Sequence, residues 1–388
     1  MLSGRYSGKA TDEQIDPTYA HLSAENTEHR VELTNAAYIS RGFAHGEWAV
    51  PARDVDVRTG RGLLRKASAS WPGWLAVTSP HAFKNAQSFL ATKPRAIANV
   101  ASLDFNELTA LADGMTAGAE LVVGLGAGRD LDAAKHVALK KDLPLVLVPT
   151  ATSCDAFVHG YYPKLNGRAL NGQRTDWPYC DPDHVILDFD LVLKAPRHLN
   201  TAGTGEVLSC YTAITEWRYA ARRGIGPLDY ERVVMPVLRY QHRLANEFPS
   251  TLDASGELTP ASITLIADAL QQRDDRKLNH PAATASEHDF ASALNLVSPR
   301  HHLHGEVVCL ASLIVTWCTN EYEHHRQRID ACKVRRRPSE IGIDKEELRR
   351  ALAFVPEYFA DRKIDSVLRR EPVIGERFDA LWEWVETR

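Results

Sequence analysis

Short apolar runs alternate with helical patterns through the first half of the chain. Strand-type runs, each a few residues long, occupy residues 74–79, 121–123, 144–149 and 185–188. Between them, apolar residues recur at helical spacing in residues 81–90, 104–118 and 131–141. This alternation predicts a mainly parallel sheet with helices on both faces.

The second half of the chain is predicted to be helical. After Pro196 the strand pattern stops, and helix-type periodicity occupies residues 204–221, 229–245, 258–276, 288–296 and 305–319. We therefore place a boundary near Ala195, between an α/β domain and an all-α domain. The domains are predicted to span residues 46–195 and 196–388, after a polar N-terminal extension over residues 1–45. A charge run over residues 271–277 is interpreted as a solvated helix end.

Composition excludes several classes of protein. The 388 residues are 44% hydrophobic and 25% charged, with a net charge of −4, so a nucleic-acid partner is not expected. The most apolar run, residues 307–318, is too short to span a bilayer and predicts a buried helix rather than a membrane anchor. The six cysteines form no C-x-x-C pair and the N-terminus has no apolar core, so we expect reduced thiols in a cytoplasmic protein.

A glycine-rich turn joins one predicted strand to the helix that follows it. The turn reads Gly124-Leu-Gly126-Ala127-Gly128-Arg129. Glycines let backbone approach a ligand, and a helix N-terminus attracts anions, so a pyrophosphate would fit there. The spacing is G-x-G-x-G rather than the Rossmann G-x-G-x-x-G. A cofactor cradle and an ordinary tight turn therefore both remain open on the glycines alone.

Three side chains from separate segments form a candidate metal set. Glu206, His288 and His304 are each predicted near the start of a helix. Two imidazoles and one carboxylate, with positions left for water or substrate, are typical of a catalytic zinc or iron site. The chain has sixteen histidines, most of which need only a surface or satisfied core position. The neighbouring His301 and His302 are accordingly not assigned to the set.

Longer motifs around these residues resemble one enzyme family. Gly124-x-Gly126-x-Gly128-Arg129-x-x-Asp132-x-Ala134-Lys135 precedes Val148-Pro149-Thr150-x-x-Ser153-x-Asp155. Ala202-Gly203-Thr204-Gly205-Glu206, Ser286-Glu287-His288 and His304-Gly305-Glu306 follow in that order. Together these motifs resemble the glycerol-1-phosphate dehydrogenases. Those belong to a larger group with glycerol dehydrogenases, iron-type alcohol dehydrogenases and 3-dehydroquinate synthases. The resemblance covers roughly residues 70–320.

The resemblance implies a Rossmann-like, dehydroquinate synthase-like α/β domain that binds NAD or NADP, followed by an all-α domain that binds metal and substrate. It implies one divalent ion, zinc with iron as the alternative, held by Glu206, His288 and His304. It places Asp155 and Ser292 at the substrate. Cofactor-lining positions fall on Gly124, Gly126, Ala127, Gly128, Arg129, Thr150, Ser153 and His159. A homodimer or higher homo-oligomer is also expected.

Departures from the family pattern leave the reaction open. The acidic metal residue is Glu206, as in dehydroquinate synthases, where these dehydrogenases carry Asp. Ser292 stands where the family has a substrate-contacting His, and His159 stands where it has Ser. The loop at residues 280–284 also differs from the family pattern. We expect a dehydrogenase for a small polyol or hydroxyketone, free or phosphorylated. A cyclase or lyase that uses NAD catalytically, and a non-catalytic homologue, are the alternatives.

Overall fold

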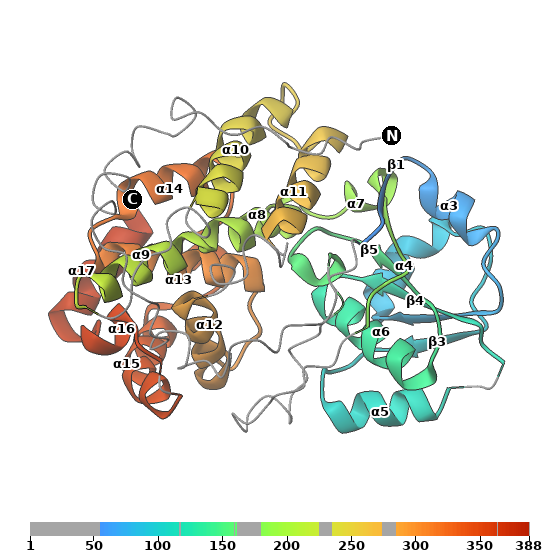
Figure 1. Ribbon diagram of the computed structural model, residues 1–388, viewed down its shortest axis with the longest axis horizontal. Coiled ribbons are helices and arrows are strands. Elements are labelled where there is room, and N and C mark those ends of the chain that lie inside the picture. The colour runs from blue at the N-terminus through green and yellow to red at the C-terminus, as the bar shows by residue number, and fades with distance from the viewer. Residues whose placement is uncertain are drawn as a thin grey trace.

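The α/β part is built on one parallel sheet (Figure 1). A computed structural model describes residues 55–115, 118–158, 160, 180–224, 235–273, 285–362 and 364–387. Within these ranges six strands pair in the order β1-β6-β5-β4-β2-β3. They are β1 Val57–Gly60, β2 Trp74–Thr78, β3 Ala96–Asn99, β4 Leu121–Gly126, β5 Leu145–Pro149 and β6 His184–Asp188. The predicted parallel sheet is confirmed, although β1 and β3, four residues each, were not predicted.

Alternate residues of the central strands pack on opposite faces of the sheet. Val122 and Leu147 join one apolar cluster with helices α5 and α6, whereas Val123 and Val148 join another with α3 and α4. This is the period of two that a strand imposes on its side chains. Helices therefore cover both faces, as expected. They are α3 Leu63–Ser68, α4 Pro80–Ala86, α5 Phe105–Asp113 and α6 Gly128–Lys141, with the short α7 Phe189–Val192 after β6.

Past α7 the described chain is helical. In Figure 1 the helices of this part lie to the left of the sheet. They are α8 Arg197–Ser209, α9 Tyr211–Ala221, α10 Met235–Thr251, α11 Pro260–Arg273, α12 Ser286–Val297, α13 His304–Cys318, α14 Tyr322–Ala331, α15 Lys345–Asp361, α16 Val367–Arg370 and α17 Gly375–Thr387. Helix α13 is almost wholly buried, as its apolar run predicts. The N-terminal extension over residues 1–45 lies outside the described residues.

One helix was wrongly predicted. The segment expected as a single helix over residues 204–221 is two, α8 and α9, which meet at Cys210, and α8 begins at Arg197. Glu206 therefore lies in the last turn of α8 rather than at a helix start. The Gly-Thr-Gly sequence before Glu206 favours a loop by propensity. Here packing overrides propensity, because those glycines face neighbouring backbone.

Helices α8 and α13 approach each other along their glycines. A Cβ at Gly205 would lie 2.4 Å from the carbonyl oxygen of Gly305, and one at Gly305 would lie 2.1 Å from that of Ala202. A Cβ at Gly203 would lie 2.0 Å from the carbonyl oxygen of Thr152, in the loop after β5. Only a residue without a side chain fits at such distances. The glycines thus bring α8 against both α13 and the edge of the sheet.

The structure also bears on the cysteines and on the most apolar helix. The six cysteines are free thiols. Among the described residues, no helix combines the length and apolar character needed to cross a membrane.

Gly305→Ala tests the close approach. The new methyl group must displace the backbone at Ala202, so we expect a loss of about 1–3 kcal/mol in the free energy of unfolding. Gly114→Ala is the control, because Gly114 caps the C-terminus of α5 with helical backbone angles and a Cβ there would lie 3.3 Å from the carbonyl oxygen of Ala110. Urea unfolding of the metal-free protein measures both. Equal stability of the two variants would contradict the packing described.

Candidate metal centre and cofactor turn

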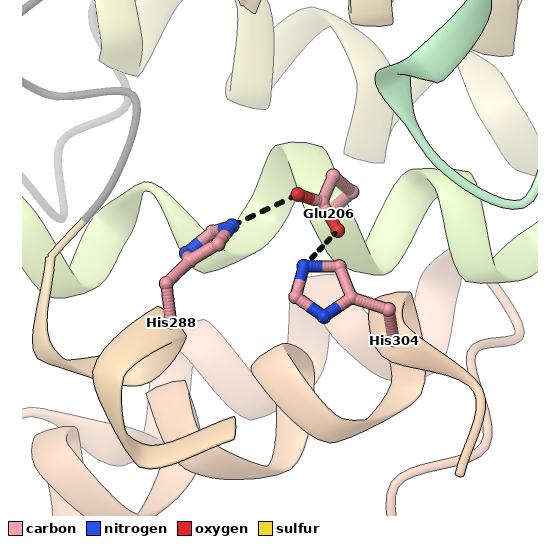
Figure 2. A group of neighbouring side chains, drawn as sticks. All are labelled: Glu206, His288 and His304. Carbon is pink, nitrogen blue, oxygen red and sulfur yellow. Dashed lines mark hydrogen bonds and ion pairs between the residues drawn. The ribbon is translucent and has the colours of Figure 1, made fainter. Parts of the chain in front are cut away.

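Glu206, His288 and His304 converge although they come from three helices. Figure 2 shows the carboxylate of α8 pointing between an imidazole from α12 and one from α13. Glu206 Oε1 lies 2.9 Å from His288 Nε2, and Glu206 Oε2 lies 3.5 Å from His304 Nε2. The Glu206 side chain is 1% exposed, whereas the imidazoles are 19% and 21% exposed. The carboxylate is thus buried, whereas both imidazoles remain partly exposed.

These residues fit a divalent ion. One ligand atom from each lies within 4.8 Å of the others, and within the described ranges no other group of three His, Cys, Asp or Glu side chains meets that condition. Glu206 Oε2 is buried and has no hydrogen-bond partner among the described residues. Its ion-pair neighbour His304 Nε2 lies 3.5 Å away. A buried carboxylate oxygen that accepts no hydrogen bond is costly, and an ion would satisfy it. Two imidazoles and one carboxylate match the ligand set of catalytic zinc sites.

Neighbouring charges shift the pKa values of Glu206 and His288. Burial opposes ionisation of Glu206, but His304, Arg273 and His288 together hold the pKa of its carboxyl well below its usual range. Burial likewise opposes protonation of His288, but the Glu206 carboxylate and then Glu287 raise the pKa of that imidazole to about 9. Without an ion, a proton on His288 therefore takes the place of the metal charge beside Glu206.

A second carboxylate orients His288. Glu287 Oε1 lies 2.6 Å from His288 Nδ1 and also accepts the backbone N–H of Ala285 at 2.8 Å. Its side chain is fully buried. A carboxylate on one ring nitrogen fixes which nitrogen faces the metal. The first turn of α12 is held further by Glu216 of α9, whose Oε2 accepts the N–H of Ser286.

Arg273 joins this group and was missed from the sequence. The charge run over residues 271–277 was interpreted as a solvated helix end, but the Arg273 side chain is 1% exposed. Its Nη1 donates to Asp155 Oδ2 at 2.5 Å, and its Nη2 lies 3.2 Å from Glu206 Oε1. Helical spacing could have predicted that Arg273 is buried, because it follows Ile266 and Leu270 on the buried face of α11.

Asp155 reaches the centre because the loop after β5 is attached to α8. The backbone N–H of Thr152 donates to Asn200 Oδ1 at 2.8 Å, and Gly203 leaves space for the carbonyl of Thr152. The same loop then carries Asp155 to Arg273. The predicted substrate residue Asp155 thus lies beside the triad, linked to Glu206 through one guanidinium.

The glycine turn lies at the carboxyl edge of the sheet. Gly126 ends β4 in register with Pro149 of β5, and the N–H of Thr150 donates to the carbonyl of Gly126 at 2.7 Å. Helix α6 begins at Gly128, with Ala127 as an N-cap that makes no side-chain bond. The predicted cofactor residues Gly126 to Arg129, Thr150 and Ser153 are therefore on two adjacent turns. Gly124, also predicted there, lies within β4, where a Cβ would collide with Ala134 of α6 and Leu147 of β5. Helix N-terminal N–H groups there have the character of an anion site.

Asp130 occupies part of this turn and was not singled out in the sequence. Its carboxylate accepts a bond from Ser79 Oγ at 2.9 Å and covers Gly126, where a Cβ would lie 2.1 Å from Asp130 Oδ2. Burial raises the pKa of Asp130. The backbone at Gly126 is left-handed, with φ of 156°, so the position requires glycine for local reasons as well.

The remaining predicted site residues are placed as follows. Ser292 is exposed on α12, one turn after His288, and its Oγ donates back to the carbonyl of His288 at 3.1 Å. Among the described residues, Ser292 thus bonds the backbone of a triad residue and makes no hydrogen bond to a side chain of the triad. His159 and the loop 280–284 lie outside the described residues.

Known protein sequences are similar to this chain over part of its length. A profile of the iron-containing alcohol dehydrogenases matches residues 77–196, from β2 to the residue before α8. The glycerol-1-phosphate dehydrogenase [NAD(P)+] of Methanothrix thermoacetophila is 29% identical over 201 residues, 51% of this chain and 54% of that protein. That of Thermoplasma acidophilum is 29% identical over 269 residues, 66% of this chain and 74% of that protein. The resemblance to the glycerol-1-phosphate dehydrogenases is confirmed.

Coverage of these relatives is partial. The chain spans 54% of the Methanothrix protein and 65% of the enzyme of the same name from Hyperthermus butylicus. The profile match ends before Glu206, so the metal triad lies outside it.

Solved structures share the fold. A probable glycerol dehydrogenase from Sinorhizobium meliloti superposes with a TM-score of 0.62 at 18% identity, covering 87% of this chain and all of that one. Glycerol dehydrogenase from Schizosaccharomyces pombe gives 0.56 at 18% identity, covering 86% of this chain and 92% of that one. The fold is therefore that of an α/β domain followed by a helical domain, as expected.

Metal content tests the triad. The purified protein is expected to hold about one divalent ion per chain, and His288→Ala or His304→Ala should lose most of it, because two ligands bind far more weakly than three. His301→Ala, at an exposed neighbouring histidine, is the matched control. Elemental analysis after removal of loosely bound ions measures all four proteins. Equal metal in the wild type and both ligand variants would show that the ion is elsewhere.

Metal affinity should depend on pH through His288. An ion needs the neutral imidazole, so affinity is expected to rise by up to about tenfold per pH unit until pH reaches about 9. The metal-free fold should behave oppositely. Because the pKa of His288 is raised above its usual 6.5, this contribution to stability is complete below about pH 6.5 and is lost as pH rises through about 9. Chelator competition and urea unfolding across this range measure the two trends. A flat affinity profile would contradict the assignment.

Proposed function

We propose that this protein is a metal-dependent, NAD(P)-linked dehydrogenase that acts on a small polyol or hydroxyketone, free or phosphorylated. One observation carries the proposal. The candidate metal triad and Asp155 are joined through Arg273, and the same loop that carries Asp155 begins at Thr150, beside the glycine turn. A cofactor on the turn and a substrate at the ion would then share one space at the carboxyl edge of the sheet, the usual ligand position in open α/β folds.

Each residue has a distinct part in this proposal. Glu206, His288 and His304 hold the ion, and Glu287 fixes the His288 ring. A bound divalent ion supplies Lewis acidity to a substrate oxygen. Asp155, oriented by Arg273, accepts a hydrogen bond from a substrate hydroxyl. The turns at Gly124 to Arg129 and at Thr150 to Ser153 orient the dinucleotide, with Ala127 and Gly128 at the start of α6 facing its pyrophosphate.

A cyclase or lyase of the dehydroquinate synthase type is the second candidate. Glu206 favours it, because these synthases carry Glu where the resembling dehydrogenases carry Asp. Such an enzyme would oxidise and re-reduce one substrate with no net change in NADH. Net NADH formation with a polyol therefore supports the dehydrogenase, whereas turnover with catalytic cofactor and no net NADH supports the cyclase. Binding of metal and cofactor with neither activity would support a non-catalytic homologue.

Further proposals concern the ion and the assembly. Zinc is the proposed ion, with iron as the alternative, because the nitrogen and oxygen ligand set suits both. A homodimer or higher homo-oligomer in the cytoplasm, acting on a small molecule, is the proposed state of the protein.

Ala127→Asp tests the cofactor turn. Gly126→Val is unsuitable, because any side chain at Gly126 would collide with Asp130. Aspartate is a favourable N-cap, so Ala127→Asp should keep or raise the melting temperature, while its carboxylate takes the place of a phosphate and weakens NAD and NADP binding at least about tenfold. Ala127→Ser, a neutral cap, is the control and should bind both. Unchanged affinity for NAD and NADP in Ala127→Asp would show that the dinucleotide does not bind at this turn.

Ser292→His tests the substrate and the reaction together. We expect net NADH oxidation with small hydroxyketones, and weak wild-type activity on dihydroxyacetone phosphate, because Ser292 stands where the family has a substrate-contacting imidazole. Ser292→His should raise kcat/KM for that phosphate, by about tenfold or more if the imidazole gains one charge-assisted bond. Ser298→His is the control, because Ser298 bonds Glu347 and Arg300 rather than a residue of the triad. This variant should not raise kcat/KM for dihydroxyacetone phosphate. Wild-type kcat/KM of about 10⁴ M⁻¹s⁻¹ or more would contradict the reading of Ser292.

A further inference from the structure

The Arg273 guanidinium lies at the edge of the candidate metal centre. Nη2 lies 3.2 Å from Glu206 Oε1 and 3.4 Å from His288 Nε2, two atoms of the proposed ligand set. Nη1 donates to Asp155 Oδ2. A fixed positive charge thus stands between the carboxylates of Asp155 and Glu206. The Arg273 side chain is buried, so its position is fixed by packing rather than being one of many conformations of a surface side chain.

The position matters because a divalent ion attracts every carboxylate within reach. Asp155 and Glu206 are separated by the two terminal nitrogens of one guanidinium. If Asp155 also bound the ion, the centre would have four protein ligands, which is the closed arrangement of structural sites. A catalytic centre needs one position left for substrate. Whether Asp155 pairs with Arg273 or with the ion therefore decides between an open catalytic site and a closed structural site.

We propose that Arg273 is a positioning residue that keeps Asp155 from binding the metal and so keeps one coordination position open for substrate. The guanidinium satisfies Asp155 with a charge-assisted hydrogen bond, and its own charge repels the ion. Wild-type affinity is therefore lower than the four side chains could provide. This inference rests on the proposed metal centre, but not on the identity of the substrate or on the dehydrogenase reaction.

A purely structural role would look different. Arg218 of α9 is such a case: it is buried and pairs with Glu321 at 3.0 Å, and neither of these residues belongs to the metal centre. We expect its removal to disturb packing and to leave the metal ligands in place, because Arg218 bonds none of them in the pair described. Arg218→Met is therefore the matched control for the loss of a buried, paired arginine in the helical part.

The experiment uses Co²⁺ bound to the full chain, read by chelator competition and by visible absorption. Arg273→Met should bind Co²⁺ about tenfold or more tightly than the wild type, because a nearby positive charge is gone and a carboxylate is released to the ion. Its visible spectrum should shift while keeping the intensity of a four-coordinate ion, because the Asp155 carboxylate takes the position otherwise left to water. The double variant Arg273→Met/Asp155→Asn should lose the part of the affinity gain that comes from the carboxylate and regain the wild-type spectrum. Arg218→Met should match the wild type.

Unchanged affinity and absorption in Arg273→Met would overturn the proposal, as would a spectral shift that persists in the double variant. If Arg273→Met does not fold, Asp155→Asn alone decides. With Arg273 present, that variant should keep the wild-type Co²⁺ spectrum and bind the ion more weakly, because Asp155 no longer neutralises the guanidinium that lies 3.2 Å from Glu206. An altered spectrum would mean that Asp155 is already a ligand, which overturns the proposal.

Failure of the proposed function is distinguishable from failure of this inference. A wild type without dehydrogenase activity, but with the Co²⁺ behaviour described, refutes the function and supports the role of Arg273. A wild type that binds no Co²⁺ refutes both the metal centre and the inference.

Discussion

The site depends on one buried carboxylate. Glu206 lies in the last turn of α8 and faces two imidazoles and a guanidinium, which together hold the pKa of its carboxyl well below its usual range. A buried carboxylate is costly unless positive groups surround it. Those groups come from α11, α12 and α13, so the helices must pack at fixed distances from α8. The glycines at 203, 205 and 305 make that packing possible.

The same constraint connects the two parts of the chain. Gly203 admits the carbonyl of Thr152, and Asn200 binds the N–H of that residue, so the loop after β5 is fixed to α8. Three residues later Asp155 meets Arg273. The candidate catalytic groups are therefore held by backbone contacts rather than by long side chains alone. Such support from rigid elements is what orientation in a catalytic site requires.

Sequence patterns predicted what is local or carried by motifs. The apolar runs at β2, β4, β5 and β6 predicted the sheet, and three motifs far apart in the chain predicted the group of Glu206, His288 and His304. The break at Cys210 and the helical setting of Glu206 were missed, because propensity treats glycine as a loop residue whereas tertiary packing used it for close approach. Arg273 was missed because a charge run usually faces solvent, although helical spacing placed this residue on the buried face of α11.

The metal centre and the cofactor turn can be tested together by anomalous diffraction at the metal edge, from crystals of the full chain grown with NAD. We expect one peak bounded by Glu206, His288 and His304, at about 2.0–2.2 Å from one oxygen and two nitrogens, with Asp155 still bonded to Arg273. We also expect dinucleotide density with the pyrophosphate at the N-terminus of α6. A metal peak bound by other residues would contradict both the triad and the role of Glu206, as would a triad that binds no ion in the presence of excess zinc and iron.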